Sequence, residues 1–538
     1  MANTSGTGRT EPLRTGSLRN GPRQQALSRR SVLLGGAAVA GAALGGSLPA
    51  CAQPAPGAAT AGAGAADPFT LGVASGDPLP DGMVLWTRLA PEPTAEDGSG
   101  GMPARPVPVE WEVAADERFT RVVQRGTTTA APEFGHSVHV ETTGLRPGHE
   151  YFYRFRTASA LSPAGRTRTA PHPGSAAELA LCFASCSHYG EGHFTAYRHL
   201  AEEEPQLVLH LGDYQYEYAA EAGDVREVLG PETRTLAGYR QRYAQYRTDP
   251  DLQLAHATAP WMVVFDDHEV DNNWARGTPE EPEEDFLQRR AAAFRAYYEN
   301  MPLRAASRPR GADMRLYRRL RWGSLINLHM LDTRQYRDDQ PCGDEGEADC
   351  PERLDPDRTL LGTEQERWLL RGLGSSSARW DVLGQQVFFS RLDTDTDDSV
   401  EFSTDSWAAY VANRDRIARG LGGTRNGVVL TGDVHRHWAG EVHAAHEDTD
   451  SPRVATELVT SSISSGGDGD SDPNAEVLDH NPHLKYYANR RGYVRAEFTA
   501  EQVRADHREL PHVSTPGAPV RTGASFAVAD GDPALHRV

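Results

Sequence analysis

The strongest constraint on the fold is a set of short, continuous apolar runs that alternate with segments of helical spacing. One such segment, residues 286–298, is rich in Ala and repeats its apolar side chains at helical intervals. Continuous apolar strands between helices indicate a sheet that is covered on both faces. We therefore predict an α/β domain over residues 173–515. The apolar runs are 179–184, 207–211, 261–265, 325–328, 382–384 and 428–430.

A different pattern precedes this domain. Between residues 67 and 172, short alternating runs such as 107–113 are separated by turn residues such as Asp81-Gly82. Short strands at this spacing are typical of a β-sandwich. Residues 143–153 resemble the end of a fibronectin-type-III-like domain, so we expect a small β-domain of that kind at 67–172.

Two further segments lack a packed pattern. Residues 53–66 are mostly Ala, Gly, Pro and Thr, which predicts a flexible linker. Residues 516–538 contain Gly, Ala and Pro. We expect a disordered C-terminal tail there, although part of it could pack back onto the domain.

The first residues have the composition of an export signal. Arg29 and Arg30 precede a Gly-rich, weakly apolar stretch that ends at Pro49. This predicts a twin-arginine signal peptide over residues 1–52 and not a membrane-spanning helix. We therefore expect the twin-arginine export machinery to carry the protein to the extracellular space, the cell wall or the periplasm. Cleavage that removes Cys51 is favoured over lipid anchoring at Cys51, because Pro49 suits a lipoprotein box poorly.

Charge narrows the range of partners. The net charge is −20 and the sequence pI is near 5.5, which argues against a nucleic-acid-binding role because such surfaces are basic. An anionic substrate would need a local positive site, which a metal cluster or a few arginines could supply. The hydrophobic share of 38% permits a packed core, and we expect a monomer.

The other cysteines differ in their setting. Cys342 and Cys350 flank a short acidic loop, and we expect them to pair in an oxidising compartment. Cys182 lies within an apolar run and is predicted to be a core residue. Cys186 follows that run and needs a separate explanation.

Residues with reactive side chains follow four of the apolar runs. Ligands bind at the carboxyl ends of strands in open α/β sheets, so we expect these residues to converge at one rim. A carboxylate after a single strand is often only a helix cap, but caps rarely supply Cys, Asp, Tyr and His together. The residues are Cys186, Gly212-Asp213, Asp266-Asp267-His268-Glu269 and Gly432-Asp433-Val434-His435.

These residue types predict a metal centre. Asp213 and Tyr216 are three residues apart and could point inward from one turn. Asp433 and His435 are two apart, so an extended segment would place them on the same side. Carboxylates suit Ca²⁺, Mg²⁺ or Mn²⁺, while imidazole and thiolate suit a transition metal. We therefore expect two unlike metal ions, with the neighbouring Tyr218 as a packed surface aromatic.

The order and kind of these motifs are highly specific. The motifs are 183–186, 212–218, 266–274 and 432–435, with lesser matches at 296–304, 331–337, 383–386 and 486–493. Together they resemble the PhoD-type alkaline phosphatases over nearly the whole mature chain. They are distantly similar to purple acid phosphatases, which use GDxxY and GNH elements. The resemblance implies an α/β fold, a four-layer metallophosphatase-like β-sandwich flanked by helices.

The same resemblance implies two metal positions. Fe(III) would be held by Cys186, Asp213, Tyr216 and His435. One or two Ca²⁺ ions would be held by Asp213, Asp433 and an asparagine after the Asp267-His268 pair. Asn273 is our choice for that asparagine, and Asn272 is the alternative.

Hydrolysis would follow from these metals. Two cations would clamp the phosphoryl oxygens and acidify a bound water into the hydroxide nucleophile. No GxSxG element lies near the motifs, which disfavours a serine nucleophile. His268, beside Asp267, would be the general acid for the leaving alkoxide or an orienter of phosphate, unless it is a capping or core histidine. Arg304 and Arg334 could bind phosphate bidentately or could serve in structural ion pairs.

The predicted function is therefore that of a secreted phosphomonoesterase and phosphodiesterase that acts on small phosphate esters and serves phosphate scavenging. A phospholipase D-like preference for phospholipid or teichoic-type diesters is the nearest alternative. A calcium-stabilised protein that binds the cell wall or carbohydrate is a further alternative. It would leave Cys186, Tyr216 and His268 unexplained.

Overall fold

The computed structural model describes residues 66–343, 350–395, 400–470 and 475–538 of the chain. The predicted twin-arginine signal and nearly all of the predicted linker lie outside the described residues. Residues Asp67–Val538 form one compact unit. Within the described parts, every helix is too short or too polar to span a membrane.

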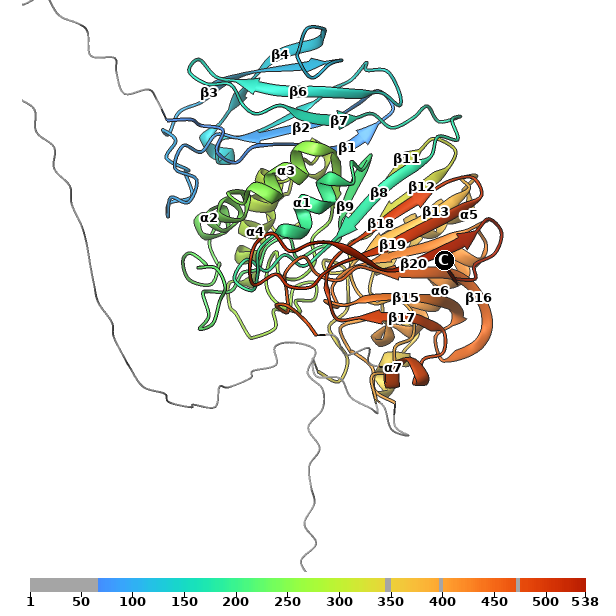
Figure 1. Ribbon diagram of the computed structural model, residues 1–538. Coiled ribbons are helices and arrows are strands. Elements are labelled where there is room, and N and C mark those ends of the chain that lie inside the picture. The colour runs from blue at the N-terminus through green and yellow to red at the C-terminus, as the bar shows by residue number, and fades with distance from the viewer. Residues whose placement is uncertain (1–65, 344–349, 396–399, 471–474) are drawn as a thin grey trace, which may run out of the picture. The chain divides into compact units, whose positions relative to one another are not determined.

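The largest sheet has ten strands in the order β21-β20-β19-β18-β8-β9-β10-β1-β2-β5 (Figure 1). Its central strands β8, β9, β10 and β1 run parallel, and antiparallel strands join on either side. Burial on both faces explains the continuous apolar sequences of β8 to β10. The strands are β1 Val73–Leu79, β2 Gly82–Arg88, β5 Ser137–Glu141, β8 Leu179–Ala184, β9 Leu207–His210, β10 Pro260–Val263, β18 Arg491–Phe498, β19 Gln502–Leu510, β20 Arg521–Ala529 and β21 His536–Arg537.

A second sheet has seven strands in the order β11-β12-β13-β14-β16-β15-β17. Its strands β12, β13, β14 and β16 run parallel, so it also has a shared carboxyl edge. The strands are β11 Arg318–Trp322, β12 Ile326–Met330, β13 Trp380–Gln385, β14 Gly427–Thr431, β15 His437–Ala445, β16 Asp448–Val459 and β17 Leu484–Ala488.

The main hydrophobic core lies between the two sheets. Leu181 and Phe183 of β8 belong to the same buried cluster as Val382 of β13 and Val428 of β14. The next residue of β14, Val429, belongs to a second cluster instead. Successive side chains of a strand point to opposite faces, so β14 packs against the first sheet on one face and against helices on the other.

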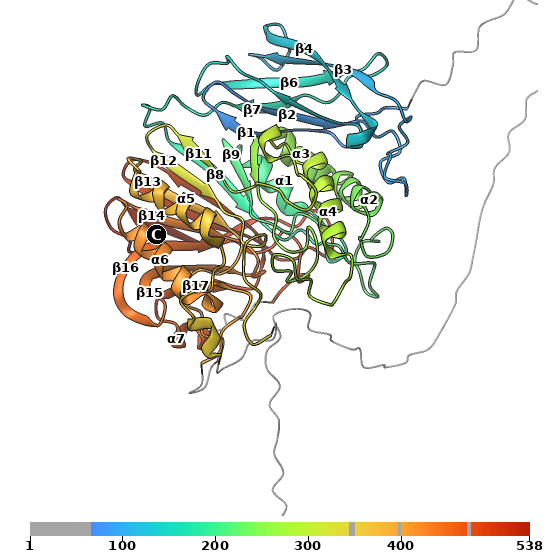
Figure 2. The same cartoon turned by 180° about the vertical axis from the view of Figure 1, so that it is seen from behind.

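Helices cover the outer faces of both sheets. Helices α1 to α4 lie beside the ten-stranded sheet (Figure 1), and α5 and α6 lie over the seven-stranded sheet (Figure 2). This arrangement confirms the expected sandwich of two sheets between helices, and the helix predicted over 286–298 is α4. The helices are α1 Thr195–Glu202, α2 Leu236–Arg247, α3 Pro250–Thr258, α4 Phe286–Asn300, α5 Gly362–Gly374, α6 Val411–Gly422 and α7 Ala475–His480.

The N-terminal strands form two packed layers, one of which belongs to the large sheet. A four-stranded sheet in the order β4-β3-β6-β7 shares a buried cluster with β1, β2 and β5. Strand β1 pairs in parallel with β10, and so the layer β1-β2-β5 continues the ten-stranded sheet. The remaining strands are β3 Val107–Ala114, β4 Val122–Ala130, β6 Glu150–Arg156 and β7 Gly165–Arg168.

The end of the chain differs from its expected disorder. Residues beyond 515 form β20, which pairs along β19, and the short β21. Ala524, Phe526 and Val528 alternate along β20 and are buried in the main core. Burial of these alternating side chains outweighs the disorder that the Gly, Ala and Pro content favours.

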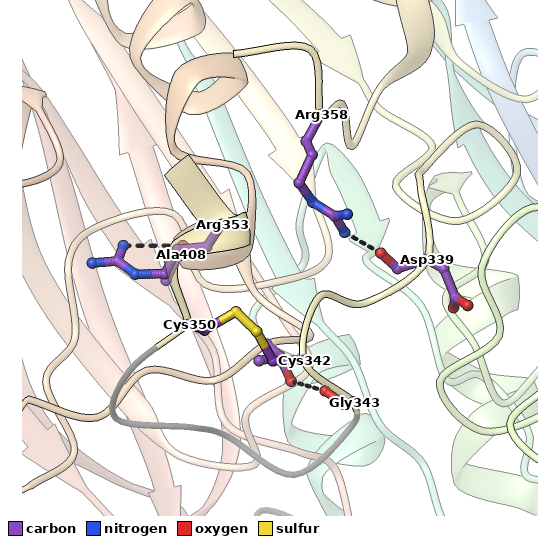
Figure 3. The surroundings of a disulfide bond; sticks show 8 residues. Asp339, Cys342, Gly343, Cys350, Arg353, Arg358 and Ala408 are labelled. Atoms are coloured by element: carbon purple, nitrogen blue, oxygen red, sulfur yellow. Dashed lines mark hydrogen bonds between the residues drawn. A yellow bond between two sulfur atoms is a disulfide. The ribbon is translucent and has the colours of Figure 1, made fainter. Parts of the chain in front are cut away.

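Two expectations about cysteine are confirmed. Cys342 and Cys350 form a disulfide (Figure 3), and Cys182 is fully buried in the main core. Beside the disulfide, the carbonyl oxygen of Gly343 accepts a hydrogen bond from Thr404 Oγ1 at 2.9 Å. The bridge therefore lies next to the segment that carries Asp405, which takes part in the site described below.

Candidate metal centre

The loops after β8 and β9 are joined by their backbones. The amide of Cys186 donates to the carbonyl of Gly212 at 3.1 Å, and the amide of Ser187 donates to the carbonyl of Asp213 at 2.8 Å. These bonds continue the parallel pairing of β8 and β9 past the ends of the strands. They hold Cys186 and Asp213 on adjacent loops.

Two glycines let the remaining loops approach. A Cβ atom at Gly212 would lie 2.4 Å from Cβ of Asp266, and one at Gly432 would lie 2.9 Å from Cβ of Ser185. Both distances are shorter than atoms can tolerate, so only glycine permits these contacts. The loops after β9 and β14 can therefore meet those after β10 and β8, as the sequence predicts.

Several predicted ligands have left-handed backbones. This conformation is uncommon for residues that carry a Cβ atom, and it costs roughly 1–3 kcal/mol per residue when the surroundings hold it. Strain of this kind is concentrated at functional sites in proteins. The φ angles are 59° at Cys186, 55° at Asp213, 48° at Asn273, 64° at Asp433 and 54° at His435.

One set of converging side chains, the mixed donor group, consists of Cys186, Asp213, Tyr216 and His435. Potential ligand atoms of Cys186, Asp213 and His435 lie within 4.8 Å of one another. Cys186 Sγ is 3.4 Å from Asp213 Oδ2. Tyr216 OH is 3.2 Å from Asp213 Oδ2 and 3.1 Å from His435 Nε2. The four side chains surround one position.

A second set, the carboxylate group, consists of Asp213, Asp266, Asp267 and Asp433. One oxygen from each of these residues lies within 4.8 Å of the others. Asp213 belongs to both groups and could bridge two ions. Asp266 and Asp267 come from the run 266–269 that was expected to converge here, although neither was assigned to a metal ion. Asp213 Oδ1 and Asp266 Oδ2 are buried and make no hydrogen bond within the described parts of the chain.

Burial shapes the electrostatics of the mixed donor group. It raises the pKa of the Cys186 thiol and the pKa of the Tyr216 phenol, and the charge of Asp213 adds to both shifts. Burial also holds the pKa of His435 well below its usual range, so the imidazole stays neutral. A neutral imidazole can offer a lone pair to a metal ion, whereas the thiol and the phenol must lose protons to bind one.

The carboxylate group concentrates negative charge away from water. Burial raises the pKa of Asp213 and the pKa of Asp433, and nearby carboxylates add to both shifts. The pKa of Asp266 rises to about 7, chiefly through burial. Burial therefore favours the protonated forms of these three acids, whereas at Asp267 the charges of Arg334 and His268 outweigh burial and lower the pKa. A cation between them would stabilise the ionised forms, and their unpaired oxygens are suitable ligands.

The two candidate asparagines are held differently. The side chain of Asn272 donates to Glu280 Oε1 at 2.5 Å and is thereby engaged away from the aspartates. The backbone amide of Asn273 donates to Asp267 Oδ2 at 2.9 Å, and its side chain makes no hydrogen bond with the described residues. These contacts favour Asn273 as the ligand.

His268 lies beside the carboxylate group. One of its ring nitrogens and carboxylate oxygens of Asp213 and Asp267 lie within 4.8 Å of one another. Its Nδ1 is 2.9 Å from Glu217 Oε2. Although burial lowers the pKa of His268, the charges of Glu217, Asp267 and Asp213 raise it well above its usual range.

Arg334 lies in a buried ion-pair network. Its Nε donates to Asp266 Oδ1 at 2.5 Å, and its two terminal nitrogens each donate to a different oxygen of Asp405 at 2.8 Å. A terminal nitrogen is also 3.4 Å from Asp267 Oδ1. The side chain is fully buried. These contacts favour the structural alternative over phosphate binding.

Arg304 lies outside both groups. Its terminal nitrogens donate to Glu141 Oε2 at 3.0 Å and to the carbonyl of Asp77 at 2.7 Å. It borders a pocket of about 200 Å³ between β1 and β11, which is also lined by Arg318 and Tyr317. The structure therefore does not bring Arg304 into contact with either donor group among the described residues.

Glu269 belongs to the run 266–269 that was expected to converge here, although the sequence predicted no separate role for it. Its carboxylate accepts hydrogen bonds from the backbone amides of Asp213 at 3.0 Å, Tyr214 at 2.7 Å and Asp266 at 2.8 Å. It thus ties the loops after β9 and β10 together. Its position directly after the Asp-Asp-His run was the only signal in the sequence.

Ser465 and Tyr218 also contribute. Ser465 Oγ lies 2.8 Å from Tyr216 OH and donates to the carbonyl of Cys186 at 2.9 Å, which links two members of the mixed donor group. Tyr218, expected as a surface aromatic, lies edge-on to the His268 ring at a centroid distance of 5.2 Å. Neither role has a signal in local sequence.

Comparison with known proteins shows similarity to phosphatases. A family model described as PhoD-like phosphatase matches residues 181–507, and a model described as its N-terminal domain matches residues 53–171. Alkaline phosphatase D of Bacillus subtilis (strain 168) is 49% identical over 484 residues, which cover 88% of this chain and 82% of that protein.

Two solved structures are similar as well. The structure of PhoD has a TM-score of 0.85 at 49% identity and covers 88% of this chain and 92% of that chain. Purple acid phosphatase PPD1 from yellow lupin (Lupinus luteus) has a TM-score of 0.53 at 13% identity, with 85% of this chain and 74% of that chain covered. The similarity to the purple acid phosphatase is a similarity of fold alone.

Proposed function

The chain belongs to the PhoD-like phosphatase family, and we propose that it is a metal-dependent hydrolase of phosphate monoesters and diesters. The observation that carries the proposal is the sharing of Asp213 between the mixed donor group and the carboxylate group. Two cations held about one bridging carboxylate can bind the oxygens of a phosphate ester and offset the charge of its transition state.

The proposal assigns a different metal to each group. Thiolate, phenolate and imidazole ligands favour a transition metal, and we assign Fe(III) to the mixed donor group. Carboxylate and amide oxygens favour a hard cation, and we assign one or two Ca²⁺ ions to the carboxylate group with Asn273. When bound, the two kinds of ion would polarise the phosphoryl oxygens and lower the pKa of a bound water.

The protein's own residues would do the rest. His268 would give a proton to the leaving alkoxide. Asp267 would hold the loop of Asn273 through the backbone amide of that residue, at 2.9 Å. Arg334 would offset part of the negative charge of Asp266 and Asp267. Its guanidinium group is engaged by these two carboxylates and by Asp405. The phosphate itself would be held mainly by the cations.

Two esters test the proposal. We expect turnover of nitrophenyl phosphate and of bis(nitrophenyl) phosphate, and we expect a chelator to remove both activities. The ratio of monoester to diester rates would decide whether phospholipid or teichoic-type diesters are the preferred substrates. Absence of activity on both esters would leave only a calcium-stabilised binding role.

A visible absorption spectrum with metal analysis tests the metals. Tyr216 bound to Fe(III) is expected to give a charge-transfer colour, and calcium is expected in the same sample. A colourless, iron-free and active protein would refute the iron assignment and leave hydrolysis standing.

Export is part of the proposal. The pair Arg29-Arg30 and the weakly apolar stretch after it support the twin-arginine route. Replacing both arginines by lysine is expected to keep the protein inside the cell, as fractionation would measure. Export of that variant at the normal rate would contradict the route.

A further inference from the structure

Residues 215–218 enclose His268 on several sides. Gln215 Nε2 donates to the carbonyl oxygen of His268 at 2.7 Å. The Tyr216 ring lies over the imidazole with the centroids 4.0 Å apart, and Tyr218 meets it edge-on at 5.2 Å. Glu217 completes the enclosure through its contact with Nδ1 at 2.9 Å. The segment that carries Tyr216 toward the mixed donor group therefore also fixes the backbone and the ring of His268.

Both carboxylate oxygens of Glu217 bind the loop that follows β10. Oε2 accepts from His268 Nδ1, and Oε1 accepts from the backbone amide of Asn272 at 3.0 Å. The Glu217 side chain is only 1% exposed, so water does not compete for these bonds. A buried carboxylate bound in this way fixes both the ring orientation of a histidine and the nitrogen that carries its shared proton.

We propose that Glu217 is a positioning residue that holds His268 with Nε2 toward the phosphate ester. The proposal rests on the hydrolytic function proposed above. Because Nδ1 is engaged by Glu217, Nε2 is the ring nitrogen left for a substrate, and within the described residues it makes no hydrogen bond. The His268 side chain keeps 10% exposure, and one of its ring nitrogens lies within 4.8 Å of carboxylate oxygens of Asp213 and Asp267.

The step that Glu217 supports is protonation of the leaving group. As water adds its oxygen to phosphorus, the bond from phosphorus to the ester oxygen breaks. His268 Nε2 gives its proton to that oxygen, and the product leaves as a neutral alcohol. A proton lost by the attacking water then restores the ring. An alkoxide needs this proton, whereas a nitrophenolate is stable without it.

Glu269 offers a matched control. It is also a buried glutamate of the site, but it accepts only from the backbone amides of Asp213, Tyr214 and Asp266. A change at Glu269 is expected to disturb the ligand loops and to slow every ester alike. A change at Glu217 is expected to slow esters in proportion to the basicity of the leaving group.

The experiment compares an alkyl phosphate with nitrophenyl phosphate in the metal-loaded protein. We expect Glu217→Ala to lower kcat on the alkyl ester by about 10- to 100-fold and on nitrophenyl phosphate by less than about 3-fold. Glu217→Gln keeps the shape and one acceptor oxygen, so it is expected to fall between Glu217→Ala and the wild type. It also provides the measurement if Glu217→Ala fails to fold. Glu269→Gln is expected to lower both rates by the same factor.

A double variant tests whether Glu217 acts through His268. In a His268→Ala background, either change at Glu217 is expected to cause no further loss on the alkyl ester. Equal slowing of both esters by the Glu217 variants, or an additive loss in the double variant, would overturn the proposal. Failure of the proposed function has a different signature, because the wild type would then hydrolyse neither ester.

Discussion

The mixed donor group and the carboxylate group share Asp213 but differ in the hydrogen-bond partners of their polar atoms. In the mixed donor group, Tyr216 OH lies within hydrogen-bond distance of Asp213, His435 and Ser465. In the carboxylate group, a buried oxygen of Asp213 and one of Asp266 have no hydrogen-bond partner among the described residues. The polar atoms of the first group engage one another in hydrogen bonds, while the second group leaves buried oxygens that a cation could bind.

Metal loading of either group is linked to the loss of protons. An ion that enters the mixed donor group must displace protons from Cys186 and Tyr216, whose pKa values are raised by burial. An ion that enters the carboxylate group must displace protons from Asp213 and Asp433, whose pKa values are also raised by burial. Arg334 already offsets part of the negative charge of Asp266 and Asp267. Metal affinity of both groups is therefore expected to fall as the proton concentration rises.

The largest expected effect follows from changing the residue that the two groups share. Asp213→Asn removes a charge from both, so we expect loss of both metals and a fall in kcat/KM of about 10⁴-fold. Elemental analysis and turnover of nitrophenyl phosphate measure the two losses. A variant that kept its ions and its full rate would show that the two groups are not one centre.

The next largest effect concerns Arg334, the arginine that is paired with the carboxylate group. Arg334→Met leaves Asp266 without its ion-pair partner and Asp405 with only Arg337, and we expect the unfolding free energy to fall by about 3–5 kcal/mol. Urea unfolding measures the loss. Arg310→Met, at an exposed arginine, is the control and is expected to change stability by less than about 0.5 kcal/mol. Equal losses in the two variants would mean that Arg334 is not the counter-charge of the acids.

A smaller and more selective effect separates the two groups. Tyr216→Phe is expected to weaken the ion of the mixed donor group by about 100-fold and to remove the visible colour, while the other ion stays. Asp433→Asn is expected to weaken the ion of the carboxylate group, while the ion of the mixed donor group and the visible colour stay. Metal titration followed by absorbance and elemental analysis measures both. If each variant lost both ions equally, the two positions would not be independent.

The smallest effect concerns the support of Tyr216. Ser465→Ala removes one hydrogen-bond partner of the phenol oxygen, and we expect a loss of about 1 kcal/mol in unfolding free energy. The charge-transfer band is expected to shift while metal content stays the same. An unchanged band would show that Ser465 serves the backbone of Cys186 and not the phenol.

The sequence predicts those parts of the site that follow directly from strand ends. Cys186, Asp213, Asp433 and His435 each come just after a buried strand, and the carboxyl ends of those strands meet as the apolar runs indicate. Tyr216 follows from its spacing to Asp213. These residues could be found because the signal lies within a few positions of the strand that carries them.

Partners that are remote in the sequence could not be found in this way. Arg334 is bound by Asp405, and Tyr216 by Ser465, through contacts that only the tertiary structure creates. Glu217 lies within the 212–218 motif, but nothing in the local sequence shows that it contacts His268. The ordered end of the chain did leave a signal, because Ala524, Phe526 and Val528 alternate as in a half-buried strand.

The parallel pairing of β1 with β10 has a consequence for anyone who would shorten this protein. Residues 67–172 supply the neighbour of β10, the strand that leads into Asp266 and Asp267. A chain that began at residue 173 would leave β10 as a bare edge, ready to pair with another molecule. The boundary suggested by sequence families is thus a poor place to cut, and a soluble catalytic fragment would need a substitute for β1.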